Sequence, residues 1–396
     1  MKAPARTDAK APAESGGGNP WVAAGAALLF LGWLFFPLAY GRFRPASSRD
    51  SLGSQEVVEH PSRNGRPWPD FLRDFSLYYE KSNPVRPLIL PKFTAFKLYT
   101  LGVSSVSSVI LGRNHWLFLG QETDKIDERR YFMGTHPFDD KTLQQWLAVF
   151  TQRRRWLEER GIAYWLVAVP NKSSIYPEYM PSKYPRGHAT RLDQLVEFMK
   201  RRAPGFPLID LRPAMQAGKK SRLLYWPTDT HWNDFGRDLA YREIVDRLAR
   251  RFPALKALPR DAFEVQPCQP GVRDLEKMLL LPWSAPEPSF RLAPTRPLPS
   301  FRIRKSGPKR DNGPVYYRSN AAALRRALII HDSFGESLKP VLSVHFKRTR
   351  WDLDRRHALP VEWIEHSRPS VVIDEFVERY LEEDPWTNPA ELRDSH

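Results

Sequence analysis

Residues 162–169, IAYWLVAV, form an almost unbroken apolar run that Pro170 closes. A run of this length is typical of a strand that is buried on both faces of a parallel sheet. Other apolar runs of strand length occur at 207–211, 327–330 and 370–373. Helical patterns separate several of these runs. The sequence therefore predicts an α/β domain with a mainly parallel sheet.

Two helices are predicted with most detail. The first precedes the 162–169 strand: Asp139 or Asp140 can cap its start, apolar residues recur at spacings of three and four, and Gly161 can end it. The second covers 234–251 and stops before Pro253. A Pro- and Arg-rich stretch at 282–310 has no period and is predicted to be an exposed loop.

Composition excludes several classes of protein. The 396 residues are 41% hydrophobic, which excludes a disordered polyelectrolyte. The single cysteine, Cys268, excludes an internal disulfide framework and a cysteine-based metal site. GxGxxG, P-loop, HExxH and EF-hand patterns do not occur, so neither a cofactor nor a metal is predicted. The formal charge of +16 resides almost entirely in residues 41–396, and it favours negatively charged partners.

The N-terminal region predicts a membrane anchor. Residues 21–40, WVAAGAALLFLGWLFFPLAY, carry no charge and are long enough for one transmembrane helix. A cleaved signal peptide is the alternative, although its apolar region is usually shorter. Basic residues balance on the two sides, so charge does not decide the orientation. We expect a flexible tail at 1–20, a juxtamembrane linker at 41–75, a catalytic domain at 76–385 and a C-terminal tail at 386–396.

The first candidate site segment is 225–233, YWPTDTHWN, in which Asp229 and His231 lie two residues apart before a helix. In an extended loop such residues point to the same side. An aspartate can then fix the tautomer of the histidine and stabilise its protonated form. The alternative is structural, because Asp and Asn commonly cap helices and Trp232 can belong to the core.

The second segment is 327–339, ALIIHDSFGESLK, in which Ser333 follows a buried strand. The carboxyl ends of parallel strands form the ligand crevice of such sheets, and a serine there has an exposed hydroxyl close to helix N-terminal amides. Ser333 is then a candidate nucleophile, with His231 as its base and the new amides as oxyanion donors. An ordinary serine N-cap is the alternative.

These segments carry a family resemblance. The chain resembles the SGNH-hydrolase-like proteins of bacterial exopolysaccharide O-acetylation, the alginate O-acetyltransferases AlgJ and AlgX and their DHHW-type relatives. The matching pieces, in order, are GRNHWLFLG (112–120), VPNKSSIYPEYMP (169–181), TDTHWN (228–233), HDSFGESLKPVLSVHF (331–346) and RPSVVIDEFVERYL (368–381). One departure is His331, where the broader superfamily usually has glycine.

The resemblance implies a flavodoxin-like α/β/α sandwich and a Ser333–His231–Asp229 triad. It also implies an inner-membrane anchor that leaves the domain in the periplasm, a polysaccharide substrate, and a multi-span membrane-bound O-acyltransferase as partner and acetyl supplier. Further candidates for substrate binding or the oxyanion hole are Asn171 as an amide donor, Lys172 and Tyr176 as wall residues, and Asp332 and Trp232 within the two motifs. Asn and Lys after a strand are also ordinary turn residues.

The resulting hypothesis is acetyl transfer through an acetyl-serine intermediate on Ser333. Two alternatives stay open. One is an esterase, in which water takes the acetyl group. The other is a membrane-tethered polysaccharide-binding or assembly scaffold with a vestigial triad. A nucleic-acid partner is not expected, because no binding module is recognised and an anchor would place such a protein poorly.

Overall fold

The computed structural model describes residues 21, 24–25, 28–32, 36, 61–82, 86–269, 271–279, 281, 289–303, 313–389 and 392. The chain divides into two compact units, residues 1–93 and 94–396. The predicted tail 1–20 and most of the predicted anchor 21–40 lie outside the described residues. Within the described residues, no helix has both the length and the apolar character needed to cross a membrane.

The first unit contains α2 (Trp68–Ser82) and most of α3 (Arg86–Tyr99), which has Pro91 inside it. Within α2, Trp68, Phe71 and Phe75 follow one another at helical spacing with ring centroids 5.9 Å apart. The predicted juxtamembrane linker at 41–75 therefore contains the start of a helix, from Trp68 onward. The apolar residues of α2 recur at spacings of three and four residues, which is a helical pattern. The Arg- and Pro-rich sequence around it makes this pattern hard to recognise.

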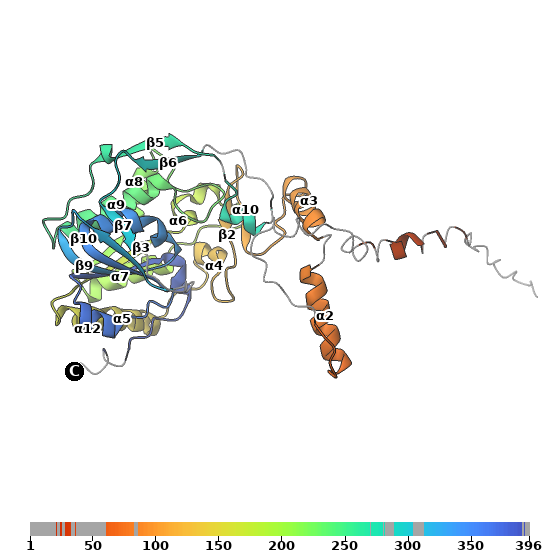
Figure 1. The fold of residues 1–396 in the computed structure, drawn as a ribbon, viewed down its shortest axis with the longest axis horizontal. Helices are drawn as coiled ribbons and strands as arrows, with labels where there is room; N and C mark the ends of the chain where they lie inside the picture. The colour runs from red at the N-terminus through yellow and green to blue at the C-terminus, as the bar shows by residue number, and fades with distance from the viewer. Residues whose placement is uncertain are drawn as a thin grey trace, which may run out of the picture. The chain divides into compact units, whose positions relative to one another are not determined.

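The second unit is built on a mixed seven-stranded sheet (Figure 1). Its strands, in spatial order, are β4 (Leu208–Asp210), β3 (Ala163–Val169), β11 (Val371–Val377), β9 (Leu324–His331), β10 (Phe346–Leu353), β8 (Val315–Ser319) and β7 (Ser300–Ile303). Pairing is parallel from β4 to β10 and antiparallel from β10 to β7. The parallel strands follow the order 2-1-5-3-4, which differs from the flavodoxin order 2-1-3-4-5 because the last strand inserts next to the first.

Helices cover both faces of the parallel part, which gives three layers. One hydrophobic cluster joins the sheet to α8 (Arg212–Gly218), α9 (Asp234–Ala249) and α11 (Lys339–Leu342). Two others join the opposite face to α5 (Asp140–Glu158), α7 (Arg191–Arg202) and α12 (Val361–Ser367). Figure 1 shows the strands between these two groups of helices. The layers form because the central strands are apolar on both sides, as β11 illustrates with every residue buried.

Local signals set the ends of the two predicted helices. The Asp139 side chain accepts a hydrogen bond from the Thr142 amide at the start of α5, and Gly161 has a φ of 69° after its end. Asn233 accepts from the Phe235 and Gly236 amides at the start of α9. Both predictions are confirmed to within two or three residues.

Shorter elements complete the second unit. They are the β1–β2 hairpin (Val109–Leu111, Leu117–Leu119), the β5–β6 hairpin (Phe263–Pro267, Phe290–Pro294), α4 (Glu128–Met133), α6 (Lys172–Ile175), α10 (Asp274–Met278), and the 3₁₀ segments η2 (Pro177–Tyr179), η3 (Arg260–Ala262), η4 (Ser333–Leu338), η5 (Ser343–His345) and η6 (Glu378–Glu382). The predicted loop 282–310 contains β6 and β7, so that prediction is wrong for its described parts. Both are edge or hairpin strands, which need no buried apolar run.

The predicted C-terminal tail 386–396 also begins inside the fold. Trp386 is buried and stacks on His357 with ring centroids 3.9 Å apart. Asn388 accepts a hydrogen bond from buried Arg153, whose guanidinium also pairs with Asp374 at 3.0 Å. The chain therefore closes over α5 before it ends. Such a buried cation requires these partners, because an unpaired buried charge is strongly unfavourable.

Candidate functional site

Ser333 lies at the carboxyl edge of the sheet, directly after β9. The carboxylate of Asp332 fixes the turn, because it accepts hydrogen bonds from the amide of Phe334 at 2.8 Å and from the amide of Val377 at 2.6 Å. Val377 ends the neighbouring strand β11, so one buried side chain ties the serine turn to two strands. Asp332 is therefore a structural anchor, and the suggestion that it touches substrate is not supported.

His331 departs from the superfamily pattern, and Gly335 compensates for it. A Cβ atom at position 335 would meet the His331 ring at 2.6 Å, so the imidazole lies in the space that the glycine leaves. Burial and the nearby charge of Lys339 lower the pKa of His331 to about 4, which keeps the ring neutral. Its Nδ1–H donates to the Asp332 carbonyl at 2.5 Å. The buried His331 side chain thus stabilises the turn that carries Ser333.

The loop before α9 brings His231 to Ser333. The Nε2 atom of His231 lies 2.9 Å from Ser333 Oγ, and its Nδ1 atom lies 2.8 Å from Asp229 Oδ1. The carboxylate of Asp229 can only accept, so Nδ1 carries the proton and Nε2 is left to accept the serine hydroxyl proton. Ser333 is partly exposed, and the His231 side chain is 32% exposed. The structure therefore brings the three predicted side chains together at a face that solutes reach.

A further carboxylate, which the sequence did not indicate, lies beside His231. Asp274, at the start of α10, has Oδ2 3.4 Å from His231 Nδ1. Burial lowers the pKa of His231, but hydrogen bonds and charges of Asp229 and Asp274 outweigh it and raise the pKa to about 9. Burial raises the pKa of Asp229, and its contacts with His231 outweigh this, so the pKa lies well below the usual range. Asp229 is ionised at neutral pH.

Within the described residues, Asp229, His231 and Asp274 are the group whose ligand atoms lie close enough to hold a metal ion. Their atoms already bond one another and Thr230, which accounts for the cluster without an ion. We assign no metal or cofactor to it.

Lys172 has a different place from the one predicted. It is buried, and its ammonium group donates to the carbonyl oxygens of Trp226 at 3.1 Å, Pro227 at 2.9 Å and Asp229 at 2.5 Å. Lys172 begins α6 directly after β3, so it fastens the Asp229 loop to the sheet. It is a clamp on the loop that carries Asp229 and His231, and it does not line the site as a wall residue.

Asn171 lies at the carboxyl end of β3, next to the groups that follow β11. Its backbone amide donates to Glu378 at 2.8 Å, and its Oδ1 atom accepts from Arg379 at 3.4 Å. The Nδ2 atom is buried and has no hydrogen-bond partner within the described residues. Such atoms are rare in native proteins and often mark functional positions. The amide of Phe334 is already bonded to Asp332, so it is not a free oxyanion donor.

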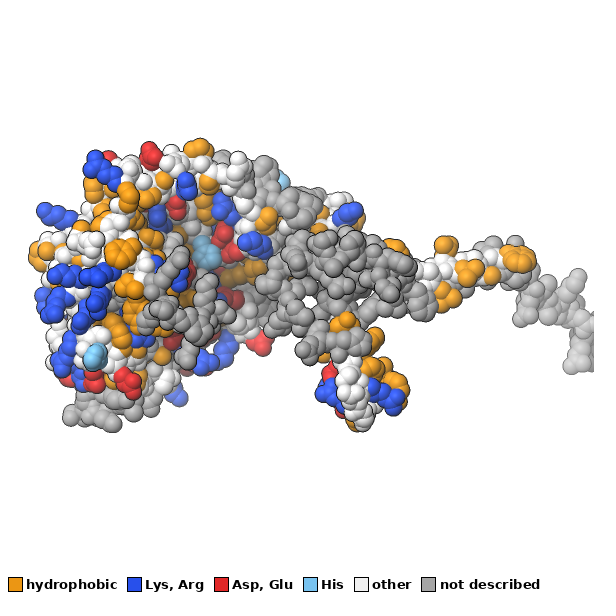
Figure 2. All heavy atoms as spheres, viewed as in Figure 1, with side chains coloured by type: hydrophobic (Ala, Val, Ile, Leu, Met, Phe, Trp, Pro, Cys, Tyr) orange, Lys and Arg blue, Asp and Glu red, His pale blue; other side chains and the backbone are white. Residues whose placement is uncertain are grey.

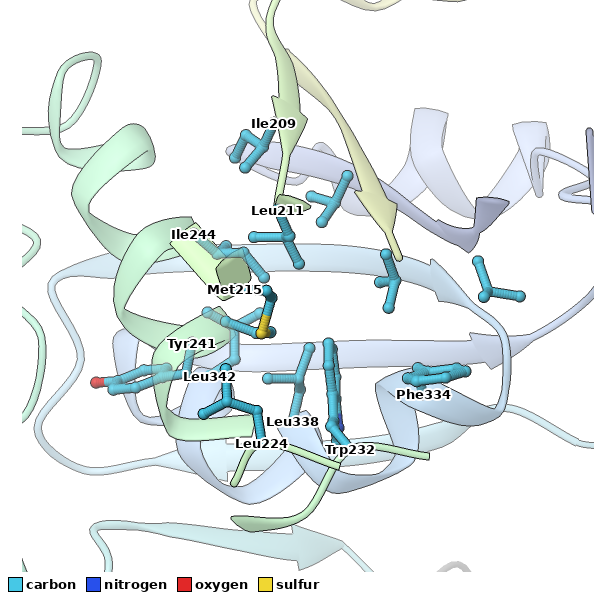
Figure 3. Packing of buried hydrophobic residues seen from close by; sticks show 14 of the residues in the cluster. Ile209, Leu211, Met215, Leu224, Trp232, Tyr241, Ile244, Phe334, Leu338 and Leu342 are labelled. Atoms are coloured by element: carbon cyan, nitrogen blue, oxygen red, sulfur yellow. The ribbon is translucent and has the colours of Figure 1, made fainter. Parts of the chain in front are cut away.

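Tyr176 and Trp232 are core residues. The Tyr176 hydroxyl accepts from the Leu224 amide at 2.9 Å, and its ring lies 4.8 Å from that of Trp116. The Trp232 ring packs edge-on against Phe334 at 5.1 Å, and its Nε1–H donates to Ser337 at 2.8 Å. Figure 3 shows Trp232 beside Leu224 and Leu338 in the hydrophobic cluster. Both side chains are buried and pack beside the residues of the site.

Comparison with known proteins identifies the family of the chain. The model of a family described as "SGNH hydrolase-like domain, acetyltransferase AlgX" matches residues 109–306, which is half of the chain. The chain belongs to this family. Membership places it among the O-acetyltransferases of the SGNH type and gives its α/β unit an SGNH-hydrolase-like fold.

Individual relatives are distant. The probable alginate O-acetylase AlgJ of Pseudomonas aeruginosa is 23% identical over 359 residues, which are 83% of each chain. AlgJ of Azotobacter vinelandii is 24% identical over 354 residues, covering 85% of this chain and 84% of that one. The solved structure of Bacillus cereus PatB1 has a TM-score of 0.52 at 17% identity, covering 70% of this chain and 98% of PatB1. This last likeness supports the fold alone.

Proposed function

We propose that the chain is a membrane-anchored, periplasm-facing enzyme that transfers acetyl groups to hydroxyls of an exopolysaccharide through an acetyl-serine on Ser333. The observation that carries the proposal is the position of His231 between two partners, 2.9 Å from Ser333 Oγ and 2.8 Å from Asp229 Oδ1. This arrangement activates a serine for attack on an acyl group. The kinship with proteins named alginate O-acetylases supports the acetyl group as the cargo.

In the first step, Ser333 Oγ attacks the acetyl carbonyl carbon while its proton moves to His231 Nε2. Asp229 holds the proton on Nδ1 and stabilises the imidazolium. The bond from the carbonyl carbon to the donor oxygen then breaks, and the proton on Nε2 passes to that oxygen. We propose Asn171 Nδ2 as a donor to the oxyanion, since this buried amide hydrogen-bonds to nothing else in the described parts of the chain.

In the second step, the sugar hydroxyl attacks the acetyl-serine. His231 Nε2 takes the hydroxyl proton and returns it to Ser333 Oγ as the serine ester breaks. If water attacks instead, the same residues perform ester hydrolysis. A product assay separates these outcomes. Incubation with an acetyl ester and an unacetylated polysaccharide should yield acetylated polymer, whereas an esterase would leave the polymer unmodified and would deacetylate a polymer that already carries acetyl groups.

A polysaccharide-binding scaffold with a vestigial triad is the second alternative. The contacts of His231 argue against the scaffold. A histidine without a catalytic role would not require hydrogen-bond partners at both ring nitrogens, nor a loop that Lys172 holds in place. The scaffold predicts that Ser333→Ala leaves polymer acetylation in cells unchanged, whereas the enzyme requires its loss.

The sheet provides a surface for a negatively charged polymer. Arg348 on β10 lies directly opposite Arg318 on β8 and Arg326 on β9, which places three arginines in one row across neighbouring strands. Arg318 and Arg348 are exposed, and no carboxylate within the described ranges pairs with them. Figure 2 shows Lys and Arg side chains gathering over the side where β9 and β10 lie in Figure 1. Like charges in register destabilise a sheet, so such a row favours an anionic ligand.

We propose that the arginine row (Arg318, Arg326 and Arg348) holds an acidic polysaccharide away from the serine. Neighbouring strands lie about 4.8 Å apart, so the three arginines present closely spaced positive charges. The double variant Arg318→Gln/Arg348→Gln should bind polygalacturonate about 3- to 10-fold more weakly, since each exposed charge contact contributes about 0.2–1 kcal/mol. Turnover of a small acetyl ester should not change. The full-length protein in detergent is titrated with the polymer and, separately, with vesicles of anionic lipid.

The control is Arg155→Gln/Arg202→Gln, which removes the same charge from exposed positions on α5 and α7. Equal loss of binding in both double variants would mean that only net charge matters. Loss of vesicle binding without loss of polymer binding would assign the arginine row to a membrane surface instead.

The anchor 21–40 and the periplasmic position are part of the proposal, supported by the uncharged apolar stretch. The resemblance further suggests a multi-span membrane-bound O-acyltransferase as acetyl supplier. Cys268 offers a native test, because it is the one cysteine of the chain and is partly exposed. A membrane-impermeant maleimide should label it in cells whose outer membrane alone is permeabilised. Labelling only after lysis of the inner membrane would place the domain in the cytoplasm, and Cys268→Ser shows the background.

A further inference from the structure

We infer that Asp274 is a second carboxylate partner of His231 and sets its strength as a base. Nothing in the family description or in the two sequence motifs assigns a role to this residue. The inference rests on the proposed role of His231 in acyl transfer. Asp274 does not touch the reacting atoms, so it acts as a positioning residue through the imidazole.

Three oxygen atoms surround His231 Nδ1. Asp229 Oδ1 lies at 2.8 Å, Thr230 Oγ1 at 3.1 Å and Asp274 Oδ2 at 3.4 Å. The Thr230 hydroxyl donates to Asp274 Oδ2, so its oxygen is left to accept from Nδ1–H. All three atoms therefore favour the tautomer with the proton on Nδ1. Two of them belong to carboxylates, which stabilise the imidazolium that forms in each step.

Asp274 is held in place independently of His231. Its Oδ1 atom accepts from the Thr230 amide at 2.8 Å and from the Leu275 amide at 2.6 Å. The backbone amide of Asp274 donates to Asp229 Oδ2 at 3.5 Å. This hydrogen bond connects Asp274 directly to the carboxylate of Asp229. Leu275 and Leu279 bury α10 against the β1–β2 hairpin. A rigid element thus delivers the carboxylate, which is what a positioning residue requires.

Other charged groups near His231 act less directly. From η4, the uncharged side chains of Ser333 and Phe334 face His231, and the Phe334 ring lies 4.9 Å from the imidazole. Lys172 contacts the Asp229 carbonyl, and the Arg379 guanidinium lies 5.8 Å from the centre of the Phe334 ring. Neither cation contacts the imidazole. The two carboxylates therefore dominate, in agreement with a His231 pKa of about 9.

The Asp274 charge should shift the pH dependence of activity in a defined direction. The free enzyme needs neutral His231, so kcat/KM for a small acetyl ester should rise with pH until about pH 9. Removing the Asp274 charge lowers the histidine pKa. In Asp274→Asn the acidic limb should move down by about one pH unit, and the alkaline plateau should fall about 3- to 10-fold because the imidazolium loses a stabilising charge. The two profiles should approach or cross near neutral pH.

The experiment uses the full-length protein in detergent and compares wild type, Asp274→Asn and Asp261→Asn. Asp261 is exposed on η3 and its loss removes the same charge without contact to His231. The second readout is NMR titration of ¹⁵N-labelled histidine, with the His231 signal assigned by His231→Gln. This readout works even if the ester is not turned over, so it separates failure of this inference from failure of the proposed function.

A shift of both the kinetic limb and the His231 titration in Asp274→Asn, absent in Asp261→Asn, is the expected result. An unchanged His231 titration, or an equal shift in the control, would overturn the inference and leave Asp274 as the first-turn acid of α10 only. Asn keeps the shape and the amide contacts of the side chain, and the thermal midpoint shows that the variant is folded.

Discussion

Ser333→Ala is expected to reduce turnover of an acetyl ester by about 10⁴-fold or more while leaving the fold intact. The hydroxyl is the group that would form the covalent intermediate, and it contributes its 2.9 Å contact to His231 and little to the core. Turnover is followed with a chromogenic acetyl ester at pH 9, where about half of His231 is neutral because its pKa is about 9. Thermal unfolding should match that of wild type.

The matched control is Ser337→Ala, on the same η4 segment. Its hydroxyl accepts from Trp232 Nε1 at 2.8 Å, so the loss should lower stability by about 1 kcal/mol and leave most of the activity. Similar residual turnover in the two variants would show that Ser333 is not the nucleophile.

Lys172→Met is expected to have the second large effect. The ammonium group satisfies three carbonyl oxygens of the loop that carries Asp229, and methionine leaves them without donors in a buried place. We expect the free energy of unfolding to fall by about 2–4 kcal/mol. Because the loop then loses its attachment to β3, we also expect kcat/KM to fall about 100-fold through misplacement of Asp229 and His231.

Lys219→Met is the control for Lys172→Met, because Lys219 also donates to a backbone carbonyl, that of Ile175. It follows α8 and pairs with Glu178, away from the loop that carries Asp229. The variant should lose some stability and keep its kinetics. If Lys172→Met proved as active as wild type under conditions where it is folded, the lysine would have no part in positioning the loop.

The sequence predicted the elements whose signal is local. The strands β3, β9 and β11 each contain a run of buried apolar residues, at 166–169, 327–330 and 371–373, so their positions can be found from the sequence. Strand β10 was missed because its sequence, FKRTRWDL, has no continuous apolar run. Buried Thr349 and Trp351 alternate in it with charged residues that are exposed or half-buried. Strand β8 and the edge strand β7 likewise show no apolar run. The mixed character of the sheet was therefore not predictable.

In the candidate site, too, only residues with a local sequence signal could be predicted. Asp229 and His231 are two residues apart, and Ser333 follows a recognisable strand, so sequence reasoning found them. Asp274 is separated from His231 by more than forty residues, and the only local signal is an acid before a short helix, which is a common cap. For Lys172 the sequence left both a wall role and a structural role open, because the direction of its side chain depends on the fold of the 226–229 loop.

The covalent role of Ser333 is tested by the intact mass of the full-length protein after brief exposure to an acetyl ester, followed by peptide mapping of the adduct. We expect one acetyl group, located on the peptide that contains Ser333. It should be absent from Ser333→Ala and His231→Ala, and it should be lost when a polysaccharide acceptor is added. An acetyl group on another residue, or an adduct that persists in Ser333→Ala, would contradict this role.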